Sequence, residues 1–289
     1  MSAQTLEKRF AQIIRAYAAG DAFGVQYEFK PPAQIIFRDE LVEVDGWPAG
    51  GVSDDTLLSL MTLQALIDHA ADPVSAAADF LRRLLAAKES LRGLGPTTRA
   101  ALGLPVSAEE QGMVGRSNGG VMRCALVGLA IGEHARRRQM VTALTRATHS
   151  HDRAVAAALV GSRLISDAIE LGSATDIDAA VHDECPEFAA EIIEFAPTDE
   201  GVTLDPIETI GAAIAASRSA TDANGALRAA CEFGGDTDTT AALAAALFVA
   251  RHPVGNGFDE ISWLSIIQWS EIPQLESVAA RLAKIRLEK

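Results

Sequence analysis

Apolar residues recur at three- and four-residue spacing along most of the chain, a period typical of α-helices with one buried face. Near the N-terminus, Leu6, Phe10, Ile13, Ile14 and Tyr17 follow this spacing. The same pattern predicts further helices over residues 57–69, 80–87, 121–131, 155–170, 207–218, 240–251 and 275–287. Residues 154–160 are apolar on nearly every face, so we expect their helix to lie inside the protein.

Evidence for β-structure is thin. A short hairpin is expected from residues 35–37 and 41–44, but no other segment alternates convincingly between apolar and polar residues. Strands and helices do not alternate along the chain, which disfavours a doubly wound sheet. The stretches 93–106 and 198–206 are interpreted as surface loops. The chain is therefore predicted to form a single all-α domain over residues 1–289.

The charge of the chain narrows the classes of partner. Its 25 basic and 39 acidic residues give a formal net charge of −14, which disfavours binding to the phosphate backbones of nucleic acids. No apolar run reaches the ~18 residues that a membrane span needs, and the N-terminus lacks the apolar core of a signal peptide. The three cysteines show no CxxC spacing and indicate reduced thiols. We therefore expect a cytoplasmic protein with neither nucleic-acid nor membrane partners.

Two aspartate-rich turns carry the strongest chemical signal. Residues 53–56 (Ser-Asp-Asp-Thr) and 236–239 (Asp-Thr-Asp-Thr) each come shortly after a pair of glycines, and each opens an apolar helix. Helix capping explains one such residue in a turn. Here, however, the carboxylates of two similar turns would repel one another without a cation. Carboxylate and hydroxyl ligands without cysteine or paired histidines disfavour zinc and favour two Mg²⁺ ions, with Mn²⁺ as the alternative.

Three further features have both a chemical and an ordinary structural interpretation. Glu28 stands between Tyr27 and Phe29, so it is either a partly desolvated general acid or base or an exposed loop acid. Residues 115–120 (Gly-Arg-Ser-Asn-Gly-Gly) open a helix, where backbone N–H groups suit a phosphate but where a simple glycine turn is equally ordinary. His149 precedes an apolar helix, a place more typical of a structural histidine than of a ligand.

Together these segments resemble the ADP-ribosylglycohydrolase family, which includes the dinitrogenase reductase-activating glycohydrolases. The matching blocks follow one another in order: residues 20–24 (Gly-Asp-Ala-Phe-Gly) with Glu28, then 53–56, 117–123, 148–149 and 234–239. They span residues 20 to 239, which is most of the chain. The resemblance implies an all-α, single-domain orthogonal helical bundle, in agreement with the helical period.

The resemblance also assigns roles to individual residues. It implies a two-magnesium centre with the ligands Ser53, Asp54, Asp55, Asp236, Asp238 and Thr239. Either aspartate of the first turn, Asp54 or Asp55, or else Glu28, would remove the proton from the attacking water. Substrate would be bound by Ser117, Asn118, Gly119, Gly120 and His149. The chain departs from the family pattern at Ser53, where threonine is usual, and at Ser117, where glycine is common.

The implied function is Mg²⁺-dependent hydrolysis of the glycosidic bond between ADP-ribose and a modified protein side chain, with arginine as the first candidate. An ADP-ribosylated protein would be the partner and ADP-ribose the product. One alternative is a metal-dependent hydrolase of O-linked ADP-ribose or a related nucleotide-like substrate. Another is an inactive relative that acts as a binding or immunity protein, although every proposed ligand position retains a carboxylate or hydroxyl group.

Overall fold

A computed structural model of the chain describes residues 2–272 and 274–288. These residues form helices and turns, with isolated β-bridges and no β-strand, so the all-α prediction is confirmed. The helices are α1 (Ala3–Gly24), α2 (Asp54–Asp68), α3 (Pro73–Ala87), α4 (Pro96–Ala101), α5 (Gly119–Cys124), α6 (His134–Arg146), α7 (Asp152–Leu171), α8 (Ile177–Glu184), α9 (Ala189–Ile193), α10 (Pro206–Ser219), α11 (Ala223–Glu232), α12 (Thr237–Arg251) and α13 (Leu275–Leu287).

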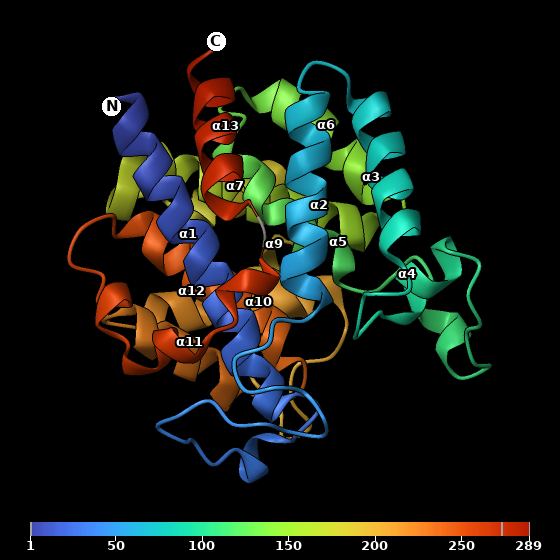
Figure 1. The fold of residues 1–289 in the computed structure, drawn as a ribbon, viewed down its shortest axis with the longest axis vertical. Helices are drawn as coiled ribbons and strands as arrows, with labels where there is room; N and C mark the ends of the chain where they lie inside the picture. The colour runs from blue at the N-terminus through green and yellow to red at the C-terminus, as the bar shows by residue number, and fades with distance from the viewer. Residues whose placement is uncertain (1, 273, 289) are drawn as a thin grey trace.

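Helix α12 forms the centre of the bundle. Every residue from Thr237 to Ala250 is buried, and α1, α7, α10 and α11 pack around the helix. Many of its residues are alanines, whose small side chains let neighbouring helices come close. In Figure 1, α13 lies beside α1, and both chain termini reach the same end of the molecule.

The contact between α1 and α12 depends on two glycines spaced four residues apart, on one face of α1. A Cβ atom on Gly20 would lie 2.4 Å from the carbonyl oxygen of Ala241, and one on Gly24 would lie 2.4 Å from the Cα atom of Asp238. No side chain fits at such distances. The glycines of the block 20–24 therefore allow the last turn of α1 to lie directly against the first turn of α12.

The expected hairpin over residues 35–37 and 41–44 is wrong. A 3-10 turn spans Pro32–Gln34, and only an isolated bridge joins Val44 to Trp47. The expected single helix over residues 121–131 is also interrupted, because α5 ends at Cys124 and the chain continues as a 3-10 turn. In addition, α4, α6, α8, α9 and α11 lie outside the predicted stripes. Helices α4, α8 and α9 are short and α6 is rich in arginine, so their apolar spacing is weak. Helix α11 has regular apolar spacing, but most of the residues that it buries are alanines.

Among the residues that the structure describes, no helix combines the length and the apolar character that crossing a membrane requires.

Candidate functional site

A cavity of about 490 Å³ collects most of the residues that the sequence predicted for the site. Its walls come from the loop after α1, the first turns of α2, α5 and α12, and the segment around α4. The predicted residues that line it are Glu28, Asp54, Asp55, Ser117, Asn118, Gly119, His149, Asp236, Asp238 and Thr239. Segments distant in the sequence therefore converge on one acid-lined cavity.

Two predicted residues do not line the cavity. Ser53 caps α2, and its hydroxyl accepts a hydrogen bond of 3.1 Å from the backbone N–H of Asp55. Gly120 is buried in the first turn of α5, where a Cβ atom would lie 2.9 Å from the Cγ2 atom of Thr145. The structure thus gives Ser53 a capping role and Gly120 a packing role next to the cavity.

The first turn of α2 is held by a buried carboxylate from another helix. Asp21, near the end of α1, is 0% exposed and accepts hydrogen bonds from the backbone N–H groups of Ser53 and Thr56, each at 3.0–3.1 Å. It also accepts a bond of 2.6 Å from the Thr56 hydroxyl. Negative charge at a helix N-terminus is favourable. Asp21 therefore caps α2 from outside, and the side chains of Asp54 and Asp55 are left to face the cavity.

The first turn of α12 is held mainly by backbone bonds. Gly235, with φ of +71°, donates to the carbonyl of Lys30 at 2.8 Å and accepts from the N–H of Phe29 at 2.7 Å. The next residue, Asp236, donates its backbone N–H to Val202 at 2.9 Å. A Cβ atom at Gly235 would meet Val202 at 2.0 Å, so only glycine fits. These bonds bring Glu28, which precedes Phe29, to the aspartates of α12.

Carboxylates gather closely in this cavity. Glu28, Asp236 and Asp238 each offer an oxygen atom, and these three atoms lie within 4.8 Å of one another. The Oδ2 atom of Asp55 is buried and has no hydrogen-bond partner. Most aspartates elsewhere at helix starts, such as Asp72 of α3, accept bonds from their own helix, whereas the Asp236 side chain makes no such capping bond. Capping therefore does not account for these acids.

The protonation of the acids reflects their crowding. Burial, followed by the charges of Asp238 and Asp21, raises the pKa of Glu28 to about 8. Burial also raises the pKa of Asp236 to about 6. The pKa values of Asp54, Asp55 and Asp238 lie well above their ordinary range, first because of burial and then because of neighbouring carboxylates. Such a cluster is stabilised by a cation, and carboxylate oxygens are the ligands that Mg²⁺ prefers.

The loop before α5 forms the opposite wall. The Nδ2 atom of Asn118 donates to Thr209 Oγ1 at 3.0 Å and to the carboxylate of Asp236. Ser117 Oγ lies 3.1 Å from His149 Nε2, so the loop is tied to the segment before α7. Burial, and then the charge of Arg123, lower the pKa of His149 well below its ordinary value. Both causes favour the neutral form of the imidazole.

Several residues of the site were not selected from the sequence. Asp21 belongs to a matching block but was given no role, since its four hydrogen bonds are visible only once α1 and α2 are placed. The segment 93–106 was interpreted as a surface loop, yet residues from Gly93 to Arg99 line the cavity, and so does Leu204 from the other predicted loop. Arg99 pairs with Glu110 there. The proline at the start of α4 was the only local signal for this wall.

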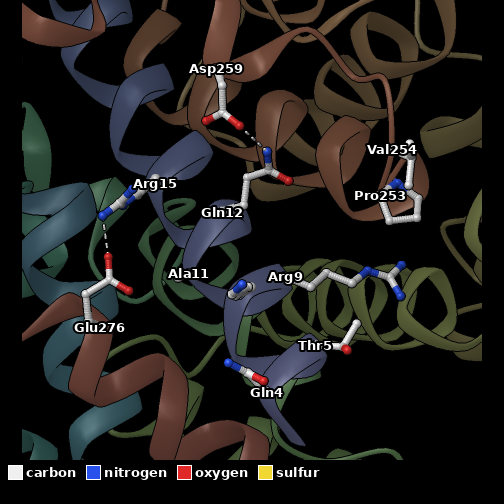
Figure 2. Close-up of a pocket in the computed structure, with 11 residues that line it drawn as sticks. Gln4, Thr5, Arg9, Ala11, Gln12, Arg15, Pro253, Val254, Asp259 and Glu276 are labelled. Atoms are coloured by element: carbon white, nitrogen blue, oxygen red, sulfur yellow. Dashed lines mark hydrogen bonds and ion pairs between the residues drawn. The ribbon is translucent and has the colours of Figure 1, made fainter. Parts of the chain in front are cut away.

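A second and larger hollow, about 740 Å³, lies beside the N-terminal half of α1 (Figure 2). Its polar side chains largely pair with one another: Gln12 donates to Asp259 at 3.1 Å, and Arg15 pairs with Glu276. Arg9 donates to backbone carbonyl oxygens at the ends of α7 and α12 instead. None of the predicted site residues, all of which the structure describes, lines this hollow. Size alone therefore does not identify the site.

The protein is an all-helical bundle with a carboxylate-lined cavity where α1, α2, α5 and α12 meet. Comparisons with known proteins identify a family with this fold. The chain belongs to the ADP-ribosylglycohydrolase family, whose sequence profile matches residues 2–288. A solved structure described as an "ADP-ribosylglycohydrolase-related protein complex" is similar at 25% sequence identity, with a TM-score of 0.78 over 98% of this chain and 100% of that one. A search among curated protein sequences gives no match.

Family membership supports ADP-ribosylglycohydrolase activity in general. The chain is thus a member of a hydrolase family that acts on ADP-ribosylated substrates.

Proposed function

We propose that this chain is a Mg²⁺-dependent hydrolase of the glycosidic bond between ADP-ribose and a protein side chain, with arginine as the preferred acceptor. The observation that carries the proposal is the carboxylate cluster of Glu28, Asp54, Asp55, Asp236 and Asp238 in one cavity. Burial and mutual repulsion raise the pKa values of these acids, so a cation that enters is favoured because it allows them to ionise. A substrate that becomes more positive as it reacts is favoured at such a place.

The donor set fits a divalent cation, by two observations. The unpartnered Oδ2 atom of Asp55 is available as a ligand, and Glu28, Asp236 and Asp238 hold oxygen atoms within 4.8 Å of one another. We therefore propose Asp54, Asp55, Asp236, Asp238 and Thr239 as ligands of two Mg²⁺ ions, or Mn²⁺, with Ser53 behind them. When bound, such ions orient hydroxyl groups and make water a better nucleophile.

The protein's own groups have three tasks in this proposal. Asn118 and the adjoining backbone of α5 bind the ribose and phosphate end of the substrate. Asp54, Asp55 or Glu28 accepts the proton of the attacking water. The remaining carboxylates stabilise the positive charge that develops at the anomeric carbon as the bond to the leaving group breaks. The guanidinium group of an arginine-linked substrate is cationic, and it leaves as a neutral guanidine that then takes up a proton. An acid-lined cavity therefore favours arginine over a neutral hydroxyl acceptor.

The cysteines support a cytoplasmic location as part of the proposal. Cys124, Cys185 and Cys231 are free and buried. Unpaired thiols are typical of reducing compartments.

The proposal is tested by measuring release of free ADP-ribose from an arginine-ADP-ribosylated protein, with Mg²⁺ and with EDTA. A serine-linked substrate is assayed in parallel. Release from the arginine-linked substrate, lost in EDTA and restored by Mg²⁺, is the expected result. Release from the serine-linked substrate alone would replace arginine with an O-linked acceptor. ADP-ribose binding without release from either substrate would overturn catalysis and favour a binding protein.

A further inference from the structure

A chain of hydrogen bonds runs from a buried arginine to the loop that forms one wall of the cavity. Arg123 Nη2 donates to Thr148 Oγ1 at 2.8 Å, and Thr148 Oγ1 lies 2.8 Å from Nδ1 of His149. On the other side of the imidazole, Nε2 lies 3.1 Å from Ser117 Oγ, which lies 2.9 Å from Thr97 Oγ1. The histidine therefore stands in the middle of a continuous chain, with a hydroxyl group on each ring nitrogen.

The direction of each hydrogen bond follows from counting the available hydrogens, starting at Thr97. The hydroxyl of Thr97 has one hydrogen, which it donates to the backbone carbonyl of Met113 at 2.9 Å, because a carbonyl oxygen can only accept. Ser117 must therefore donate its own hydrogen to Thr97, and Thr97 also accepts the N–H of Gly115 at 3.1 Å. With that hydrogen used, Ser117 can only accept from the imidazole. The hydrogen of the neutral His149 ring therefore lies on Nε2.

The near end of the chain agrees with this assignment. Since Nε2 carries the hydrogen of the neutral ring, Nδ1 is an acceptor, and the Thr148 hydroxyl donates to it. The same hydroxyl accepts from the guanidinium of Arg123, which can only donate. Each hydrogen bond from Thr148 to the carbonyl of Met113 then has one donor and one acceptor, and all of them point in the same direction. At Arg123, the two hydrogens of Nη2 are shared among the carbonyls of Leu144 and Thr145 and the hydroxyl of Thr148.

Arg123 is well suited to anchor such a chain. Its side chain is 1% exposed, and its guanidinium lies 4.2 Å over the ring of Phe80 on α3. Its Nη2 atom also donates to the backbone carbonyls of Leu144 and Thr145, at 2.6 and 3.2 Å, in the last turn of α6. The negative end of a helix stabilises a cation there. The position of the first donor is thus fixed by three helices.

We propose that His149 is a positioning residue, held as the Nε2–H tautomer by Arg123 and Thr148 so that it fixes the loop of Ser117 and Gly119. Both ring nitrogens are occupied within the protein, so the imidazole neither exchanges a proton with the substrate nor binds a metal ion. Its ring lies against Gly119, where a Cβ atom would be 2.8 Å from His149 Cε1. The imidazole therefore sets how close the loop comes to the cavity.

What the loop binds, ADP-ribose, rests on the proposed function, but the tautomer does not. The first experiment is therefore NMR of protein labelled with ¹⁵N in histidine, with the His149 signals identified by their absence from the variant His149→Gln. The expected result is a neutral Nε2–H ring across the physiological pH range. A neutral Nδ1–H ring, or a doubly protonated one at pH 7, would overturn the proposal whatever the enzyme activity is.

A matched pair of variants tests whether the hydrogen-bonded chain from Arg123 to Met113 positions the loop for binding. Thr148→Ser keeps the hydroxyl that donates to Nδ1, whereas Thr148→Val removes it with little change in size. We expect Thr148→Ser to keep the tautomer and the affinity for ADP-ribose, measured by calorimetry. Thr148→Val is expected to keep the Nε2–H ring, which Ser117 still requires, but to weaken binding by about tenfold, since the buried Nδ1 acceptor is left without a donor.

The outcomes separate this proposal from the proposed function. Equal affinity of Thr148→Val and Thr148→Ser for ADP-ribose would overturn the positioning role. Failure of the unaltered protein to bind ADP-ribose would contradict the proposed function, while the NMR result would still decide the tautomer. If Thr148→Val does not fold, Thr97→Val against Thr97→Ser tests the other end. Removing the Thr97 hydroxyl leaves the hydroxyl of Ser117 without its partner, so Thr97→Val is expected to bind ADP-ribose more weakly than Thr97→Ser.

Discussion

The two aspartate turns look alike in sequence, but the structure holds them in different ways. The turn of α2 is held by one buried side chain, Asp21, which accepts bonds from Ser53 and Thr56. The turn of α12 is held by the backbone of Gly235 and by the Thr237 hydroxyl, which donates to the carbonyl of Gly24 at 2.8 Å. Asp21 and the carbonyl of Gly24 lie in the last turn of α1, whereas Phe29 and Lys30, the partners of Gly235, follow that helix in the chain.

This difference explains why the carboxylates of both turns are not used as helix caps. Because Asp21 of α1 caps α2, the side chains of Asp54 and Asp55 are not needed as caps, and Asp55 keeps an oxygen atom without a hydrogen-bond partner. Where the backbone fixes the start of α12, Asp236 makes no side-chain capping bond. One turn depends on a buried charge and the other on glycine conformation. Substitutions at the two turns should therefore fail in different ways.

The largest effect is expected from removing an acid on either side of the cavity. Asp54→Ala or Asp236→Ala should lower the rate of ADP-ribose release by at least about 10³-fold, in line with groups that stabilise transition-state charge. The thermal midpoint without metal should not fall, because each change removes one of several mutually repelling carboxylates. Activity assays and thermal unfolding measure the two effects separately.

Asp222→Ala is the matched control, because Asp222 caps α11 by accepting a bond of 2.7 Å from Gly225. It should lose about 1 kcal/mol of stability and keep its activity. If the Asp54 or Asp236 variant unfolded, these acids would be required for stability. The interpretation that both turns hold acids that are not needed for folding would then be wrong.

Next in size is the effect of filling the contact between α1 and the α12 turn. In Gly24→Ala the new Cβ would lie 2.4 Å from both the Cα atom of Asp238 and the carbonyl oxygen of Thr237, so backbone must move. We expect a loss of about 1–3 kcal/mol in urea unfolding together with a loss of activity. Gly112→Ala, where nothing lies within 4 Å, should leave both nearly unchanged. Equal stability of the two variants would refute the close approach.

The sequence predicts the acids of both turns better than their supports. Asp54, Asp55, Asp236 and Asp238 stand out because carboxylates at such spacing are costly without a purpose. Asp21 does not stand out, since it is a single acid whose partners lie more than thirty residues away. Its importance depends on burial, and a local pattern contains no information on which distant N–H groups an acid will meet.

The same limit applies to the fold. Helices with a continuous apolar stripe, such as α12, are predicted close to their observed positions, because their periodicity records burial. Segment 93–106 was taken for a surface loop because prolines and glycines dominate it, yet Pro96 begins α4 and the segment closes one side of the cavity. Composition describes how the backbone turns there, whereas the contacts of the segment depend on the rest of the bundle.

A similar loss of stability, but one confined at first to the α2 turn, is expected from Asp21→Asn. The amide can accept through only one oxygen, and its NH₂ group faces the N–H groups of Ser53 and Thr56, so a loss of about 2–3 kcal/mol is expected. Asp72→Asn is the control, because an asparagine caps α3 as well as an aspartate does. Urea unfolding of both variants measures the difference. A loss no greater than that of Asp72→Asn would mean that α2 does not depend on the buried carboxylate.

The smallest effect should come from the α12 turn, where Thr237→Val removes one hydrogen bond to Gly24. The backbone bonds of Gly235 to Lys30 and Phe29 remain, so the turn should keep its place and the loss should be about 1 kcal/mol. Thr237→Ser keeps the hydroxyl and should be closer to the unaltered protein. Both variants should retain ADP-ribose release. If Thr237→Val cost as much as Asp21→Asn, the α12 turn would depend on a side chain after all, and the contrast between a charge-held and a backbone-held turn would be wrong.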